Sequence, residues 1–167
     1  KYNTLINKRA VYGGGGIMPD YFVPLDTTKL TKIHQGINGS GLISRYTMSY
    51  VEENRQSILN TYKTFADYRN KFVVTQSMLD TLLKMYKEDI KEKADDKANV
   101  KEITPEDLSD FETSKSLITM QIKAYIASDL YERGDYYEIL NEINDPLKRA
   151  LEIINNSDEY DKLLKGK

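Results

Sequence analysis

The chain has 167 residues, 40% of them hydrophobic and 30% charged, with a net charge of −2 and a pI near 5.6. Cysteine is absent, which excludes disulfides and thiolate chemistry. The slight excess of acid argues against nucleic acid as a partner. No apolar run approaches the ~20 residues that cross a bilayer, so we expect no membrane span. The length suits one domain with one core.

Two short strands are predicted over residues 5–12 and 17–23, around the four glycines Gly13–Gly16. Glycines bury no side chain and lose much backbone entropy, so consecutive glycines mark a sharp bend or a close approach. Pro24 ends the extended run because it lacks the N–H of a strand ladder. A lone two-stranded ribbon is marginal in water. We therefore expect these strands to belong to a larger sheet or to pair with another copy of the chain.

Beyond Asp26 the apolar residues recur at the spacing of helices. Helical segments are predicted over residues 30–37, 42–51, 58–68 (as short, broken pieces), 78–86, 108–130, 136–143, 147–154 and 160–164. The charged run 91–101 has no apolar periodicity and predicts a solvated connection. The chain is therefore predicted to be mainly α, a multi-helix bundle with a short N-terminal β-hairpin or strand segment.

Capping residues predict where several helices begin. Asp26, Thr27 or Thr28 is expected to cap the first helix, and Thr75 or Ser77 the helix over 78–86. The run Thr104–Asp107 combines a capping hydroxyl, a proline at the first helical position and acids in the first turn. Asp145 with Pro146 predicts another start, and Ser157 is expected to cap the last helix.

The segment Arg9–Asp20, with the letters RAVYGGGGIMPD, resembles the signature near the end of the peptidase core in carboxyl-terminal processing peptidases (tail-specific proteases) of the Bacteroidetes type. Further blocks follow in the order of that family's helical tail: Gly41–Tyr46, Phe72–Thr75, Ile122–Ala127 and Asn144–Pro146. The likeness covers essentially the whole chain, and the glycine block is its strongest part.

The resemblance implies that residues 1–28 are the terminal strand segment of an α/β peptidase core and residues 29–167 a helical C-terminal domain. In that family a Ser/Lys dyad cleaves the peptide bond through an acyl-enzyme, and a PDZ domain recognises substrate tails. Both dyad residues lie upstream of the glycine signature, so neither maps onto this chain. The resemblance also implies protein or peptide substrates and a periplasmic or cell-envelope location. The chain begins at Lys1 without an initiator Met, and we expect it to be a piece of a longer protein.

The chain's own candidates for catalysis are weak. Ser40 lies between Gly39 and Gly41, but the Gly-x-Ser-x-Gly elbow would need glycine at Asn38, so Ser40 is predicted to be a turn residue. Lys29 and Lys32 are expected to be solvated. His34 is the single histidine, and we expect a surface or interfacial position rather than a catalytic one.

Sites for cofactors and metals are not expected either. The glycines precede an extended segment and not a helix, unlike a phosphate-binding loop. Asp95, Asn99 and Glu106 match three positions of a calcium loop, but lysine and valine occupy two others that the loop needs. Zinc is not expected in a chain with one histidine and no cysteine. The adhesion-like tripeptide 133–135 is expected at a helix break.

Tyrosine is abundant, with 13 residues against four phenylalanines and no tryptophan. Seven tyrosines suit either a groove for an apolar peptide tail or packing in the core: Tyr46, Tyr50, Tyr62, Tyr86, Tyr125, Tyr136 and Tyr137.

Two hypotheses follow. In the first, the chain is the C-terminal helical region of a serine endopeptidase, is itself inactive, and carries no catalytic, cofactor-binding or metal residue. In the second, it is a non-catalytic helical module that binds protein partners. In either case the N-terminal strands are expected to pair between copies and give a homo-oligomer.

Overall fold

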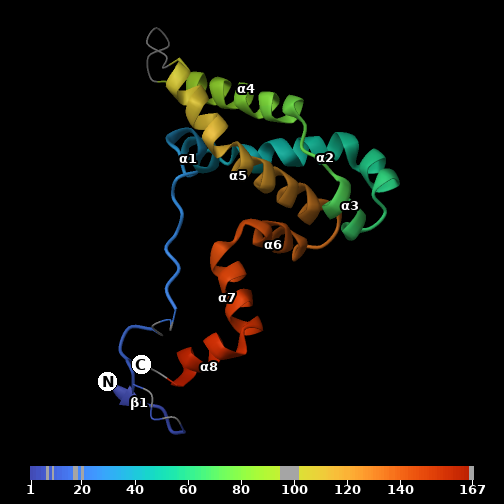
Figure 1. Ribbon diagram of the computed structural model, residues 1–167. Helices are drawn as coiled ribbons and strands as arrows, with labels where there is room; N and C mark the ends of the chain where they lie inside the picture. The colour runs from blue at the N-terminus through green and yellow to red at the C-terminus, as the bar shows by residue number, and fades with distance from the viewer. Residues whose placement is uncertain (7, 9, 17–18, 20, 95–101, 166–167) are drawn as a thin grey trace. The chain divides into compact units, whose positions relative to one another are not determined.

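The computed structural model describes residues 1–6, 8, 10–16, 19, 21–94 and 102–165 (Figure 1). These residues form α1 Lys32–Gly39, α2 Leu42–Thr61, α3 Phe65–Lys71, α4 Gln76–Lys93, α5 Pro105–Leu130, α6 Asp135–Leu140, α7 Asp145–Asn155 and α8 Ser157–Lys165, with a 3-10 turn η1 Asn141–Ile143. Their strands are β1 Tyr2–Asn3 and β2 Ala10–Val11. The predicted mainly-α bundle with a short hairpin is confirmed.

The fold consists of two compact units. The larger, Asp26–Glu142, is the helical body; the smaller, here the terminal unit, combines Lys1–Leu25 with Ile143–Lys167. None of the helices in the described ranges has the length and apolar character required to cross a bilayer.

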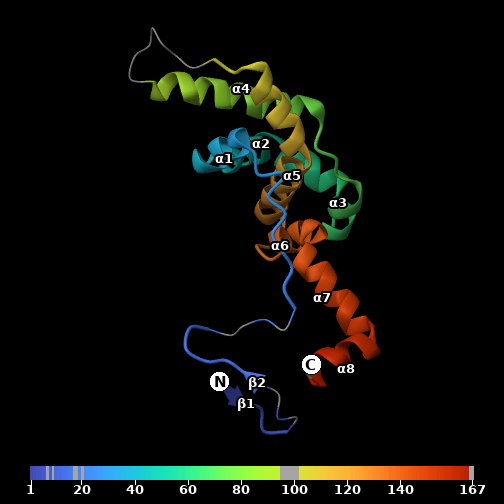
Figure 2. The same cartoon turned by 60° about the vertical axis from the view of Figure 1, so that its left-hand side comes forward.

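Helix α5 is the centre of the helical body. It contacts α1, α2, α3 and α6, and Figures 1 and 2 both show it crossing among these helices. Three of its isoleucines, Ile118, Ile122 and Ile126, are fully buried at helical spacing in the core. The apolar residues predicted over 108–130 therefore lie on the buried face of α5, and this face packs against the neighbouring helices.

Helices α1 and α2 meet at a tight turn. The hydroxyl of Thr31 accepts a hydrogen bond from the backbone N–H of His34 and caps α1, so the prediction of a cap at 26–28 is wrong. Asp26 instead accepts hydrogen bonds from Thr28 in a local turn. Gly41, with φ of 66°, lets the chain reverse into α2 at a left-handed position that suits glycine.

Helix α2 runs unbroken to Thr61, so the prediction of broken pieces from residue 58 is wrong. Ile58 lies on its buried face, and the break comes after Tyr62. There the Thr64 hydroxyl accepts from the N–H of Asp67 and caps α3. Packing against α5 extends the helix beyond the stripe that the sequence showed.

An aromatic cluster fastens α3 to α5. The buried Tyr68 ring stacks on Phe72 with centroids 4.5 Å apart, and its hydroxyl donates to the carbonyl of Lys123 at 3.0 Å. Tyr131 donates to the carbonyl of Tyr62 at 2.5 Å. The hydroxyls of Tyr68 and Tyr131 thus each have a backbone carbonyl as acceptor.

Helices α4 and α5 begin where predicted. Thr75 accepts from the N–H of Met78, and Thr104 forms a reciprocal capping box with Asp107. Helix α4 continues to Lys93, beyond the predicted start of the charged connection at residue 91. The rest of that connection, 95–101, lies outside the described residues.

In the terminal unit, β1 and β2 pair antiparallel, with Tyr2 opposite Val11 and Asn3 opposite Ala10. The loop between them therefore precedes the glycines, and the prediction of one strand over 5–12 that turns at the glycines is wrong. In this loop Lys8 adopts a left-handed φ of 53°. Gly14, Gly15 and Gly16 all have positive φ, which only glycine adopts readily. Residues 17, 18 and 20 of the second predicted strand lie outside the described residues.

The last two helices of the terminal unit are capped by asparagines. The Asn144 side chain accepts from the N–H of Leu147, with Pro146 in the first turn as predicted. Asn156, and not Ser157, caps α8 by accepting from the N–H of Glu159. Arg149 of α7 lies over the Tyr21 ring, 4.8 Å from its centroid.

Candidate functional site

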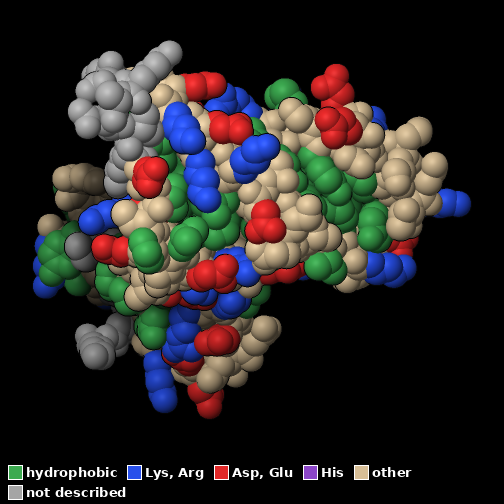
Figure 3. All heavy atoms as spheres, turned by 90° about the horizontal axis from the view of Figure 1, so that it is seen from above, with side chains coloured by type: hydrophobic (Ala, Val, Ile, Leu, Met, Phe, Trp, Pro, Cys, Tyr) green, Lys and Arg blue, Asp and Glu red, His purple; other side chains and the backbone are tan. Residues whose placement is uncertain are grey.

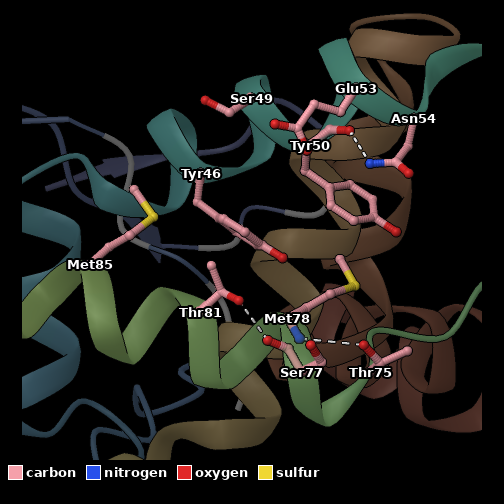
Figure 4. A pocket seen from close by; sticks show the side chains of 10 residues that line it. All are labelled: Tyr46, Ser49, Tyr50, Glu53, Asn54, Thr75, Ser77, Met78, Thr81 and Met85. Carbon is pink, nitrogen blue, oxygen red and sulfur yellow. Dashed lines mark hydrogen bonds between the residues drawn. The ribbon is translucent and has the colours of Figure 1, made fainter.

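Two helices of the body, α2 and α4, leave an open pocket between them, which Figure 4 shows from close by. We call it the α2–α4 groove. Its volume is about 380 Å³. It is lined by Tyr46, Ser49, Tyr50, Glu53, Asn54, Thr75, Ser77, Met78, Thr81 and Met85. A pocket of this size falls within the range of known ligand sites.

The floor of the groove is aromatic and sulfur-rich. Tyr46 and Tyr50 extend from α2, and Met78 and Met85 extend toward them from α4 (Figure 4). The two tyrosine rings are 6.0 Å apart and tilted by 41°. Tyr46 is only 7% exposed, and its burial, with the neighbouring Tyr50 and the charge of Glu53, raises its pKa to about 12. The Tyr46 hydroxyl is therefore neutral at physiological pH.

Short polar side chains form the rim, and most are bonded within their own helix. Thr81 donates to the carbonyl of Ser77 at 2.8 Å, and Asn54 donates to the carbonyl of Tyr50 at 2.9 Å. Thr75 caps α4. Because these bonds are local, they hold the rim in shape without closing the groove.

Glu53 differs from the rest of the lining. It is the one charged residue among the described residues that line the groove. Across the part of the chain that the structure describes, its carboxylate forms no hydrogen bond or ion pair. It is exposed at the edge of the apolar floor. The groove thus combines an apolar surface with one available negative charge.

The lining residues suit binding better than catalysis. Ser49 and Ser77 offer hydroxyls, but no histidine or lysine lines the groove beside them among the described residues. A serine nucleophile needs such a base within hydrogen-bond reach. The same tyrosines, methionines and polar rim are typical of surfaces that bind another polypeptide.

The seven tyrosines singled out in the sequence do not share one groove. Only Tyr46 and Tyr50 line the α2–α4 groove. Tyr62 packs in the aromatic cluster, 6.0 Å from Tyr68. Tyr125, Tyr136 and Tyr137 form a separate chain of edge-to-face rings, and Tyr86 packs over Gly36. Tyr46 therefore lies in the core and also lines the groove, whereas Tyr137 is exposed and does neither; whether the groove holds a peptide tail stays a prediction.

Ser40 does lie beside a lysine, in an arrangement that fixes structure. Its hydroxyl donates to Asp89 at 2.8 Å and accepts from Lys93 Nζ at 2.9 Å. Lys93 also pairs with Asp89 at 2.8 Å and is 61% exposed. Ser40 and Lys93 thus share the Asp89 carboxylate, which joins the turn between α1 and α2 to the C-terminal end of α4. Arg45 completes the cluster, 3.4 Å from Asp89.

His34 is buried, and the prediction of a surface position is wrong. Its Nε2 lies 3.1 Å from the Gln121 amide oxygen and 2.9 Å from the Asn38 amide nitrogen. Its Nδ1 is buried without a partner in the described structure. Through its contact with Gln121, His34 joins α1 to α5.

The remaining sequence candidates lie apart from the groove. Lys29 and Lys32 are exposed, as predicted. Gly134 precedes α6 at a helix break, also as predicted. Asp95 and Asn99 lie outside the described residues. Among the residues that are described, no three His, Cys, Asp or Glu side chains gather closely enough to hold a metal ion.

Sequence reasoning missed the groove as a whole and the Asp89 cluster. Tyr46 and Tyr50 are four residues apart on α2, and Met78 and Met85 are seven apart on α4, so each pair shares a helix face. The sequence shows this spacing, but it does not show that α2 and α4 lie side by side. Asp89 meets Ser40 across 49 residues of sequence, and no local pattern indicates such a contact.

Comparison with known proteins gives one match. A family model described as a family of unknown function, DUF8443, matches residues 33–132. No curated protein matches the chain. No solved structure matches it either.

Proposed function

The chain belongs to this family of unknown function, DUF8443, and we propose that its helical body is a non-catalytic module that binds a segment of another protein in the α2–α4 groove. The observation that carries the proposal is the groove itself: an open, preformed pocket of about 380 Å³ with tyrosines and methionines on its floor. The groove lies within the residues that the family model matches.

The chemistry of the floor supports a polypeptide as the occupant. Tyr46 and Tyr50 present apolar ring faces together with hydroxyls, a combination enriched at protein interfaces. Met78 and Met85 have flexible, polarisable side chains that adapt to different apolar partners. A helix or an extended strand that lays apolar side chains into the groove would bury this floor.

Peptide display on the whole chain tests the proposal. Random peptides of about 12 residues, long enough for three helical turns, are selected on the immobilised protein and their affinities measured. Thr81→Trp fills the groove from its exposed rim without removing a core residue. It is expected to weaken the selected peptides about tenfold or more.

Thr113→Trp is the matched control. Thr113 is also an exposed helical threonine that donates to the carbonyl four residues earlier, but it lies on α5 and does not line the groove. Its substitution should leave peptide affinity unchanged. Equal losses for the two variants, or no peptide sensitive to Thr81→Trp, would exclude the groove as a binding site.

A second proposal places this chain in a larger enzyme: the C-terminal helical region of a serine endopeptidase of the carboxyl-terminal processing type. It rests on the resemblance of residues 9–20. One structural observation favours it: Gly14, Gly15 and Gly16 adopt positive φ, so this segment uses glycine for its backbone shape and not for flexibility alone. The periplasmic or cell-envelope location and the peptide substrates belong to this proposal.

Covalent labelling of the protein that carries this chain tests the second proposal. An active-site serine probe should modify a serine upstream of Lys1 and none of the serines within residues 1–167. Capture of a serine within the chain, Ser40 included, would contradict it. The two proposals are compatible, because a helical region beside a peptidase core can bind protein segments.

A further inference from the structure

We propose that the segment bound in the α2–α4 groove combines an apolar stretch with a lysine or arginine that pairs with Glu53. This inference rests on the proposed binding function of the groove and specifies the chemistry of its partner. The inference is based on the position of the unpaired Glu53 carboxylate beside the apolar floor of the groove.

The surroundings of Glu53 supply no counter-ion. On α2 the residues three and four positions away are Ser49, Tyr50, Gln56 and Ser57, none of them basic. Across the groove, α4 presents Ser77, Met78, Thr81 and Met85, which are uncharged. Within the described residues the carboxylate is therefore left to solvent.

The closest basic residue along α2 is already engaged. Arg55 donates to the carbonyl of Asp129 on α5 at 3.1 Å and does not line the groove. Some glutamates of the chain have a basic partner three or four residues away, as Glu88 has Lys84 and Glu112 has Lys115. Glu53 lacks such a partner and, unlike the exposed Glu52 beside it, lines the groove.

The charge of Glu53 reaches the groove floor. Burial is the main cause of the raised pKa of Tyr46, and the negative charge of Glu53 adds to it. A cation placed by a bound segment at this edge would meet that negative potential beside an apolar surface. An apolar segment alone would cover the floor but leave the carboxylate without a partner, so the basic residue supplies specificity.

Parallel peptide selections on three forms of the protein test the inference. On the wild-type chain the recovered peptides should carry Lys or Arg at a fixed spacing from their apolar residues. On Glu53→Lys the preference at that position should change to Asp or Glu. On Glu52→Lys, the adjacent exposed glutamate that does not line the groove, the wild-type preference should remain.

Affinities of one selected basic peptide complete the test. Glu53→Gln should weaken binding about three- to fivefold, as expected for an ion pair at a partly exposed rim, whereas Glu52→Gln should not. The same loss should follow when the peptide's basic residue is replaced by norleucine. Added salt should reduce the wild-type affinity and have less effect on Glu53→Gln.

The outcomes separate this inference from the function on which it rests. The selected peptides could bind the wild type and lose affinity for Thr81→Trp, yet contain no basic residue or keep the same preference on Glu53→Lys. That result would overturn the inference and leave the binding function intact. If no selected peptide depends on the groove, both fail together.

Discussion

In the helical body most large apolar side chains are buried, whereas in the terminal unit most are exposed. The core of the body includes residues from α1, α2, α4, α5 and α6. In the terminal unit Ile153 is the buried large hydrophobic among the described residues. Its exposed ones are Tyr2, Leu5, Ile6, Tyr12, Tyr21, Phe22, Leu25, Ile143, Leu151, Ile154, Tyr160 and Leu164.

The comparison indicates which unit has a hydrophobic core of its own. The body has a core of buried side chains from several helices, and the family model matches residues inside it. Figure 3 views one face of the molecule and shows hydrophobic side chains exposed among charged ones. In the body the exposed large hydrophobic side chains are few: Met48, Val73, Leu108 and Tyr137 among the described residues. In the terminal unit, a two-residue strand pair and two amphipathic helices lack a core large enough to stabilise them alone.

The largest expected difference between the units comes from one substitution made in each. Ile122 of α5 is 0% exposed, and Ile122→Ala should lower the free energy of unfolding by about 2–5 kcal/mol. Ile154 of α7 is 63% exposed, and Ile154→Ala should change the free energy of unfolding by less than about 0.5 kcal/mol. Urea unfolding followed by circular dichroism measures both, and similar losses would contradict the distinction between the units.

Gly36 tests how tightly the body is packed. A methyl group at Gly36 would overlap the Tyr86 hydroxyl and lie 3.0 Å from Cζ of the same ring. Overpacking costs about 1–3 kcal/mol and the gain in helix propensity offsets part of it, so Gly36→Ala should destabilise by about 1–2 kcal/mol.

Two further variants check the cause. Gly39→Ala, where nothing lies within 4 Å, should be neutral or stabilising. In a Tyr86→Phe background, which removes the overlapping hydroxyl, Gly36→Ala should lose much of its cost. An unchanged cost in that background would show that Tyr86 is not responsible.

The Asp89 cluster predicts a dependence of stability on pH. Burial raises the pKa of Asp89, but hydrogen bonds from Lys93 and Ser40 and the charge of Arg45 outweigh it and hold the pKa below its ordinary value of 3.8. Its stabilisation is therefore present above that value and is lost as pH falls through the folded-state pKa. Asp89→Asn should cost about 1–2 kcal/mol at neutral pH.

Unfolding free energies of the wild type and of Asp89→Asn should converge as the pH is lowered from about 6 to about 3. Ser57→Ala, at an exposed position of α2 away from the cluster, provides a control whose difference from the wild type should not change with pH. Parallel curves for Asp89→Asn would mean that the carboxylate charge contributes nothing to the fold.

The terminal unit is predicted to associate between copies through its strands, because within the described residues each strand of the pair has a partner on one side only. Sedimentation velocity should show a weak, concentration-dependent increase in size. Ala10→Lys, at an exposed position of β2, should reduce the association and change the unfolding free energy by less than about 0.5 kcal/mol. A chain that stays monomeric at every concentration would contradict the prediction.

Local sequence signals predicted the helices better than the strands or the groove. Thr75 and the run Thr104–Asp107 fix helix starts through hydrogen bonds within a few residues, so the sequence alone predicted them. The end of α2 depends on packing against α5, and the strand register depends on a loop whose shape the residues do not dictate.

The groove depended on tertiary structure. The sequence predicts Tyr46 and Tyr50 as groove candidates, but it gives no signal for Glu53, because an isolated surface glutamate belongs to no motif. Its significance arises only when α4 places uncharged side chains opposite it. The sequence predicts a surface or interfacial position for His34, and its burial depends on partners such as Gln121, far away in sequence.

Methyl NMR of the methionines tests the central claim most directly. With ¹³C-methyl methionine in the whole chain, a selected peptide should shift the signals of Met78 and Met85, which line the groove. The signals of Met48 and Met120, on α2 and α5 outside it, should stay in place. Shifts at Met48 or Met120 without shifts at Met78 and Met85 would contradict binding in the α2–α4 groove.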